Sequence, residues 1–225
     1  MADDDALRAV RAKRGYLLPH HGLMATAAPG LLEAYDQAYT QIALTARHLS
    51  EHDREFIWLA VLATTDEGLA THHIAKFRAA GGTDAMIGAA FTAAAMAIGG
   101  QAFDFAARDW GVQLAPFDAR AAYLEACQGG APWRLTLLAL LGAMVCRRRE
   151  RLLGWLIEAG YEASIPEDAM AEAMTLAMFP GSIPYFVRAC GVWRALIVAG
   201  SVTASPRYAA WAAMTGQGGF DEASQ

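Results

Sequence analysis

Glycine and proline residues divide the chain into segments of helical length, and this spacing restricts the fold more than any other feature. Nearly every segment between them is rich in Ala, Leu, Met, Glu and Arg, which are strong helix formers. We find no convincing strand pattern in the sequence. The sequence therefore predicts an all-α protein.

The first helices are predicted from the spacing of apolar residues. Over residues 31–46, apolar and aromatic side chains recur three and four positions apart, which is typical of one helix face. Ser50 is expected to cap the next helix by accepting the backbone N–H of Asp53. Residues 56–63 are apolar on all sides, so this second helix should be central and buried.

Two further helices are expected in the first half. One should cover residues 66–80 and end at Gly81-Gly82, because glycine favours the backbone that stops a helix. Thr83 is expected to cap the next one, which should run to Ile98.

The second half repeats this plan. A helix over 133–146 corresponds to the buried helix, and one over 147–159 corresponds to the next, with Gly160 as its C-cap. Ser164-Ile165-Pro166-Glu167 predicts a capping box at the start of a further helix, which should stop before Pro180.

A shift of 80 residues aligns like residues of the two halves, which indicates an old duplication. Chance matches between alanine-rich helices are the alternative, and the coincidence of caps and helix breakers favours the duplication. The aligned pairs are Ala93 with Ala173, Ala97 with Ala177, Phe105 with Tyr185, Arg108 with Arg188 and Gly111 with Gly191. We therefore expect an arm over 1–30, a first helical repeat over 31–115, a second, degenerate repeat over 116–200 and a tail over 201–225.

Composition excludes several classes of protein. With 55% hydrophobic residues and a formal net charge of -5, the chain can bury a core but has no basic surplus for binding nucleic acid. The acidic amino terminus has no apolar secretory segment behind it, so a cytoplasmic protein is expected. The uncharged stretch over 85–103 consists mostly of Ala, Gly and Thr, which insert weakly into lipid. We interpret it as a packed helix and turn, and expect no membrane partner.

Charged side chains within apolar helices are the candidates for chemistry, because burying a charge is costly unless another group compensates it. His73 falls on the apolar stripe of its helix and should face inward, with His72 beside it near the edge. Glu67 lies about 120° from His73 around that helix, so Glu55 of the preceding helix is the expected partner. A carboxylate that touches a buried imidazole fixes its tautomer and favours its protonated form, as a general acid requires.

Glu67 is expected near the amino end of its helix, where the helix dipole favours an anion. There it could accept a proton or orient a substrate. A Glu and a His in an apolar setting can also be a satisfied structural pair, and this alternative stays open.

The same residues carry a family resemblance. Arg54-Glu55 opens an apolar run that leads to Glu67 and His73, and a helix ending in Ala79-Ala80-Gly81 precedes a restart at Thr83-Asp84. This pattern resembles the repeat of the carboxymuconolactone decarboxylase and alkylhydroperoxidase D family. That repeat usually reads Arg-Glu-Leu, an apolar run, Gly-(Ala/Cys)-Glu-Tyr-(Glu/Cys)-x-x-x-His and a helix to Ala-Gly. The resemblance covers about 31–111, and the second half up to about 200 resembles the same fold in degraded form. It implies an alkylhydroperoxidase D-like helical bundle.

The departures from the family pattern restrict the chemistry. The Cys-x-x-Cys of alkylhydroperoxidase D-type members is replaced by Asp66 and Leu69, so a dithiol is not available for peroxide reduction. Gly68-Leu69-Ala70 stands where decarboxylase-type members have an aromatic residue and a second carboxylate, so we expect a substrate other than the lactone that names the family. In the second repeat, the counterparts of Glu67 and His73 fall on or next to Cys146 and Leu152, which implies one working site per chain.

Residues and resemblance together predict a cofactor-independent lyase or isomerase that acts on a small organic acid or lactone. His73 would move the proton at carbon, Glu55 would orient and charge it, and Glu67 with His72 would position the substrate or act as a second base. No metal, thiamine or pyridoxal site is visible in the sequence, so the substrate's own carbonyl must store the developing charge.

Arg148 and Trp58 are the candidates for binding the substrate. The run Arg147-Arg148-Arg149-Glu150-Arg151 replaces the second site, and a solvated helix face is one interpretation of it. The other is that one arginine holds a substrate carboxylate. His20-His21 and His48 with His52 are poorly placed to share a metal.

Two rival functions remain open. One is a non-catalytic helical protein that binds a ligand or partner. The other is residual thiol peroxidase chemistry at Cys146 or Cys190; these two and Cys127 are too far apart to suggest a disulfide framework or a zinc site. Because alanine- and glycine-rich helices leave flat apolar faces and the resembled family forms rings, we expect a homo-oligomer, with a trimer among the arrangements.

Overall fold

Residues 2–219, which this computed structural model describes, are mostly helical and contain no strand. The all-α prediction is therefore confirmed. The chain divides into two compact units, Met1–Ala46 and Arg47–Gln225. This boundary lies beyond the end of the arm expected over 1–30.

The first unit is a small helical cluster. Its helices are α1 (Ala2–Arg14), α2 (Pro19–Ala27) and α3 (Pro29–Tyr39), and a π-helical turn, η1 (Thr40–Leu44), extends α3. Val10, Ala25 and Leu32 form its apolar core, one residue from each helix. The Arg14 guanidinium lies 2.7 Å from the Asp36 carboxylate and 4.0 Å from the centre of the Tyr39 ring. The expected arm is thus folded, and it packs against the helix that follows it.

His21 gives this unit a predicted sensitivity to acid. Its Nδ1 accepts the Leu18 N–H, and its Nε2 faces an Arg14 nitrogen at 3.1 Å, so both ring nitrogens already meet donors. Burial, followed by the charges of His20 and Arg14, lowers the pKa of His21 to about 4. In the unfolded chain the pKa would be about 6.5. The unfolded state therefore binds the extra proton between pH 6.5 and 4, and the first unit should lose stability as pH falls through this window.

Amide hydrogen exchange over residues 19–39 would measure this loss after correction for the intrinsic rate. His21→Asn keeps an acceptor near the Leu18 N–H and removes the titration, so its protection should change less between pH 7 and pH 4. An equal loss of protection in both proteins would show that His21 is not the group responsible.

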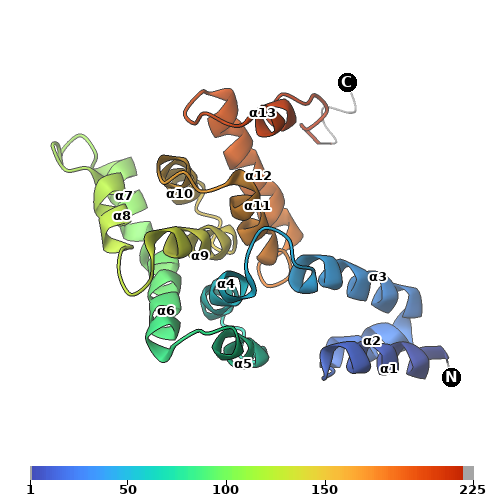
Figure 1. The fold of residues 1–225 in the computed structure, drawn as a ribbon. Helices are drawn as coiled ribbons and strands as arrows, with labels where there is room; N and C mark the ends of the chain where they lie inside the picture. The colour runs from blue at the N-terminus through green and yellow to red at the C-terminus, as the bar shows by residue number, and fades with distance from the viewer. Residues whose placement is uncertain (1, 220–225) are drawn as a thin grey trace. The chain divides into compact units, whose positions relative to one another are not determined.

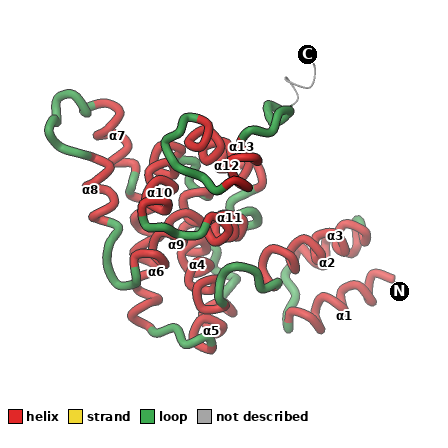
Figure 2. The backbone as a smooth tube through the Cα atoms, turned by 45° about the horizontal axis from the view of Figure 1, so that its top comes forward, coloured by secondary structure: helices red, strands yellow, loops and turns green. Residues whose placement is uncertain are grey.

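In the second unit, the other helices are arranged around two helices, α4 and α9 (Figures 1 and 2). Most residues of these two helices are buried. In chain order its helices are α4 (Glu51–Thr64), α5 (His72–Ala79), α6 (Asp84–Gly99), α7 (Gln101–Asp109), α8 (Ala119–Ala126), α9 (Trp133–Val145), α10 (Glu150–Glu162), α11 (Glu167–Leu176), α12 (Ile183–Val198) and α13 (Pro206–Ala212). Helix α4 packs against α5, α6, α9 and α11, and α9 packs against α4, α6, α10 and α11. The tail expected over 201–225 includes helix α13, which packs against α12.

Helices α4 and α9 lie at the centre because residues 56–62 of α4 and 135–145 of α9 are almost wholly apolar on all sides, which only a buried helix tolerates. Gly142 permits their close crossing. A Cβ at this position would lie 3.0 Å from the Ala173 carbonyl oxygen of α11 and 3.1 Å from Val61 Cγ2 of α4. Three helices therefore meet at one glycine, and this contact fixes the helix that carries Glu55.

Three predicted helix starts were wrong. The helix expected over 147–159 begins at Glu150, after Arg148 takes a left-handed backbone at φ 54°. The helix expected over 66–80 begins at His72, because α4 closes with the Glu67 N–H bonded to the Leu62 carbonyl and with Asp66 at φ 57°. The capping box predicted at Ser164 is absent, and the N-cap of α11 is Pro166.

The predicted end at Gly160 was also wrong, because α10 continues to Glu162. A Cβ at Gly160 would lie 2.4 Å from Met170 Sδ, so this glycine serves close packing of α10 on α11 rather than termination. Ser164 takes the left-handed position at φ 54°, and the Ile165 N–H bonds to the Gly160 carbonyl.

The two halves share a packing order without establishing a duplication. Helix α4 packs on α5 and α6, as α9 packs on α10 and α11. Left-handed residues follow both central helices, at Asp66 and at Arg148. These correspondences fit the repeat plan, and the duplication stays a prediction.

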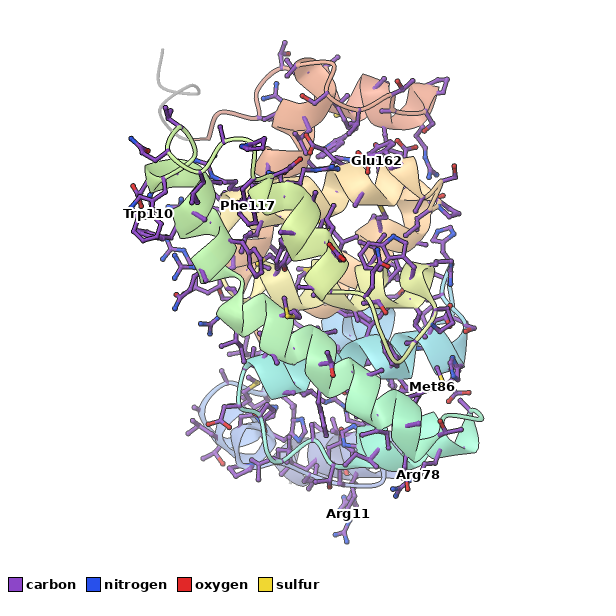
Figure 3. The ribbon with its side chains drawn as sticks, turned by 90° about the vertical axis from the view of Figure 1, so that its left-hand side faces the viewer. Arg11, Arg78, Met86, Trp110, Phe117 and Glu162 are labelled. Carbon is purple, nitrogen blue, oxygen red and sulfur yellow. The ribbon has the colours of Figure 1, made fainter. Side chains whose placement is uncertain are left out.

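One stretch of the described chain, Asp84–Asp109, is long and apolar enough to cross a membrane by length and composition. It comprises α6 and α7, has a mean hydropathy of 1.4, and is 33% buried in its most apolar window. Alanines of α6 are buried, and α6 packs against α4 and α9. Figure 3 shows Met86, near the start of α6, and Trp110, beyond α7, at opposite ends of this stretch.

Candidate functional site

The site is built on the first turn of α4. Ser50 Oγ accepts the Asp53 N–H at 3.1 Å, which confirms the predicted cap. The preceding residues are held by Glu172 of α11, whose Oε2 accepts the backbone N–H groups of His48 at 2.7 Å and Leu49 at 3.0 Å. The position of Glu55 is therefore set from two sides, by its own helix cap and by a carboxylate from the second half.

The structure brings Glu55 and His73 together. Glu55 Oε2 lies 2.5 Å from His73 Nδ1, and the two residues are 2% and 3% exposed. The contact joins the fifth residue of α4 to the second residue of α5. A carboxylate at Nδ1 holds the proton on that nitrogen and so fixes the tautomer of the ring.

Trp58 and His72 flank this imidazole. The Trp58 ring stacks on His73 with centroids 4.8 Å apart and planes inclined by 26°. The His72 ring lies on another side, with centroids 4.2 Å apart. Burial, followed by the charges of His73 and Lys76, lowers the pKa of His72 to about 4. His72 is thus neutral at neutral pH, and one of its ring nitrogens can accept a hydrogen bond.

His73 Nε2 makes no hydrogen bond within residues 2–219. Because Nδ1 is engaged with Glu55, Nε2 is the nitrogen through which this ring can exchange a proton with another molecule. The arrangement of an oriented imidazole, a carboxylate behind it and one remaining nitrogen is that of a general acid or base.

Glu67 lies outside this cluster. It is exposed in the loop between α4 and α5, and its Oε1 accepts the Leu69 N–H at 2.7 Å. The expected position near a helix amino end was wrong, because α5 begins five residues later than Glu67. The role of Glu67 as a second base stays a prediction without support from its position.

Arg148 is also exposed, and its guanidinium lies 5.1 Å from the centre of the Tyr185 ring. No hydrogen bond or ion pair of the described chain joins it to Glu55 or His73. Its neighbours contact α7: Arg149 donates to Gln101, and Arg151 pairs with Asp104. A groove of about 590 Å³ between α10 and α12 is lined by Arg151 and Arg188, and its lining contains neither residue of the pair.

The cysteines and the other histidines do not extend the site. Burial raises the pKa of the Cys127 and Cys146 thiols to about 12 and also raises that of Cys190, which disfavours the reactive thiolate. His52 contacts Asp53, and His48 lies 4.0 Å from Asp168. Among residues 2–219, no group of three or more His, Cys, Asp or Glu side chains is placed to hold a metal ion.

Two buried residues of this region were not singled out from the sequence. Arg54, beside Glu55, is 7% exposed, and its Nε and Nη1 atoms have no partner in the described chain. Glu172 is buried on α11 and anchors the segment before α4. Both could have been found by the reasoning that identified Glu55, since each is a charge within an otherwise apolar helix.

Comparisons with known proteins give a family match for one part of the chain. Residues 29–112 match the model of the carboxymuconolactone decarboxylase family, close to the 31–111 over which the sequence resembles it. No curated protein and no solved structure matched the chain. The matched segment contains Glu55, Trp58 and His73. Residues 29–112 are therefore similar to the carboxymuconolactone decarboxylase family.

Proposed function

We propose that this protein is a cofactor-independent lyase or isomerase that moves protons on a small organic acid or lactone. The observation that carries the proposal is the 2.5 Å contact between Glu55 Oε2 and His73 Nδ1, which leaves Nε2 without a partner. The family match over residues 29–112 supports decarboxylase-like chemistry as its class.

In the proposed decarboxylation, the bond between the substrate carbon and its carboxylate breaks and CO₂ leaves. The electron pair moves into the enolate formed with the substrate's own carbonyl. His73, oriented by Glu55, then delivers a proton from Nε2 to that carbon, and water restores the proton. In an isomerisation, neutral Nε2 would instead remove a proton from one carbon and return it to another.

Access to this nitrogen requires movement. Because His73 is 3% exposed, a substrate reaches Nε2 when the neighbouring side chains, Trp58 or His72, shift. The neutral His72 would accept a hydrogen bond from the substrate. Trp58 would cover the reacting carbon and exclude water.

Turnover in D₂O tests this function. The protein is incubated with carboxymuconolactone and with a set of β-keto acids, and CO₂ release and deuterium at carbon are followed by NMR. We expect one class to lose CO₂ and to gain one deuterium at the carbon that carried the carboxylate. Binding of these acids without CO₂ release or deuterium incorporation would favour the rival function, a non-catalytic ligand-binding protein.

We also propose that the chain forms a homo-oligomer through the exposed apolar side chains of α6 and α7. Phe91, Ile98 and Phe105 are each exposed by more than a third, and the first two lie on α6, whose alanines are buried on its other face. A second copy of this surface would cover them. The cytoplasmic location and the absence of nucleic-acid and membrane partners remain predictions from composition.

A further inference from the structure

One face of α4 carries buried donors that lack acceptors. The unpaired atoms are Nε and Nη1 of Arg54 and Nε1 of Trp58, and none of them has a hydrogen-bond partner in the described chain. Arg54 is 7% exposed and Trp58 is 3% exposed. Buried polar groups in folded proteins are nearly always paired, so three unpaired atoms on one helix require an explanation.

These donors lie on the same side of the helix. Arg54 and Trp58 are four residues apart, which places their side chains one above the other on one face. The Trp58 ring also stacks on His73. One of the two unpaired side chains, Trp58, therefore contacts the imidazole whose Nε2 has no partner, and Arg54 lies one helical turn from Trp58 on the same face.

The unpaired atoms of Arg54 and Trp58 determine which kind of ligand could bind to them. A guanidinium and an indole N–H can only donate, and the guanidinium is always charged. An acceptor with negative charge fits both. No carboxylate in residues 2–219 lies within 4.0 Å of the Arg54 nitrogens, although Glu55 is its neighbour in sequence.

We propose that Arg54 and Trp58 bind the carboxylate of a small organic acid next to His73. This inference deepens the proposed function and rests on it for the identity of the acid as substrate. The substrate carboxylate is therefore assigned to α4, the helix that carries Glu55. In the sequence analysis Arg148 was the candidate for binding it. A carboxylate held on α4 would place the adjoining carbon of the acid near Nε2.

An unpaired buried guanidinium has a predictable effect on the stability of the folded state. A buried charge without a partner destabilises the folded state, and an apolar residue of similar volume relieves this penalty. In buffer without carboxylates, Arg54→Met should therefore have a higher Tm than the natural protein. Added acid should raise the Tm of the natural protein by mass action and leave that of Arg54→Met unchanged.

The binding test uses acetate as the probe and the ¹⁵N-labelled full chain. The indole signal of Trp58 is assigned with Trp58→Phe, and acetate, neutral acetamide and sodium chloride are then titrated separately. We expect a saturable shift of this signal with acetate alone. The shift should vanish in Arg54→Met, weaken in Arg54→Lys and persist in the control Arg78→Met, whose exposed guanidinium pairs with Asp84.

Several results would overturn the inference. One is a shift of equal size with chloride or acetamide, and another is a saturable acetate shift that Arg54→Met retains. A Trp58 signal that depends on protein concentration and ignores acetate would show that the acceptor belongs to a second copy of the chain. Because binding is measured without turnover, failure of the proposed catalysis would leave a positive acetate result standing, and the two outcomes stay distinguishable.

Discussion

Replacing His73 by glutamine is expected to lower turnover by about 10²- to 10⁴-fold, the usual contribution of a positioned general acid or base. Glutamine has a similar reach and can still hydrogen-bond to the Glu55 carboxylate, which lies 2.5 Å from Nδ1 in the natural protein. It has no group that titrates, so proton transfer at carbon stops while the contact between α4 and α5 remains. The measurement is kcat for the acid identified in the D₂O assay, with helical circular dichroism to confirm folding.

The control for this variant is His48→Gln, which removes a half-exposed histidine that contacts neither residue of the pair. Its kcat should stay near that of the natural protein. Turnover by His73→Gln at the natural rate would contradict the assignment. If Glu55 acts only through His73, adding Glu55→Gln to His73→Gln should lower kcat little further, because groups that act as a unit give non-additive losses.

The pairing of Glu55 with His73 could be predicted because it follows from the energetics of burial. An imidazole on the apolar stripe of a helix needs a compensating group, and the first turn of the preceding helix offered a carboxylate. The prediction required only that the two helices pack together. Helix caps at Ser50 and Thr83 were equally predictable, since a side-chain oxygen there meets a backbone N–H within the same turn.

The positions of Glu67 and Gly160 were not predictable from local pattern. The start of α5 depends on how α4 closes, and the left-handed residue that closes it is Asp66, a residue without the freedom of glycine. Gly160 was interpreted as a helix end because glycine usually marks one, but its role is to admit Met170. That contact joins helices whose relative position no local rule gives.

The unpaired state of Arg54 could not be predicted from the sequence, for a different reason. Its charge within an apolar helix was visible in the sequence, but a charge next to Glu55 suggests a pair. Adjacent residues on a helix point about 100° apart, and the structure shows that Glu55 bonds to His73 while Arg54 stays unpaired. Only coordinates could show which of the two was already satisfied.

Replacing Glu172 by alanine is expected to lower the free energy of unfolding by about 3 kcal/mol, the order expected when charge-assisted hydrogen bonds to buried groups are lost. Glu172 Oε2 accepts the His48 and Leu49 N–H groups, and the Leu49 bond is buried. Without the carboxylate these donors lose their acceptor. Urea unfolding of the full chain measures the loss, and Glu162→Ala, which removes an exposed carboxylate paired with Arg120, should change the value by less than about 0.5 kcal/mol.

The same variant tests whether the second half supports a site that it does not itself contain. Glu172 belongs to α11, whereas the segment that it holds leads into α4 and Glu55. If α11 positions the pair, Glu172→Ala should lower kcat more than Glu162→Ala even under conditions where both proteins are fully folded. Glu172→Gln, which keeps one acceptor oxygen, should recover part of both losses. A stable Glu172→Ala protein with natural kcat would show that the cap at Ser50 alone is sufficient to place Glu55.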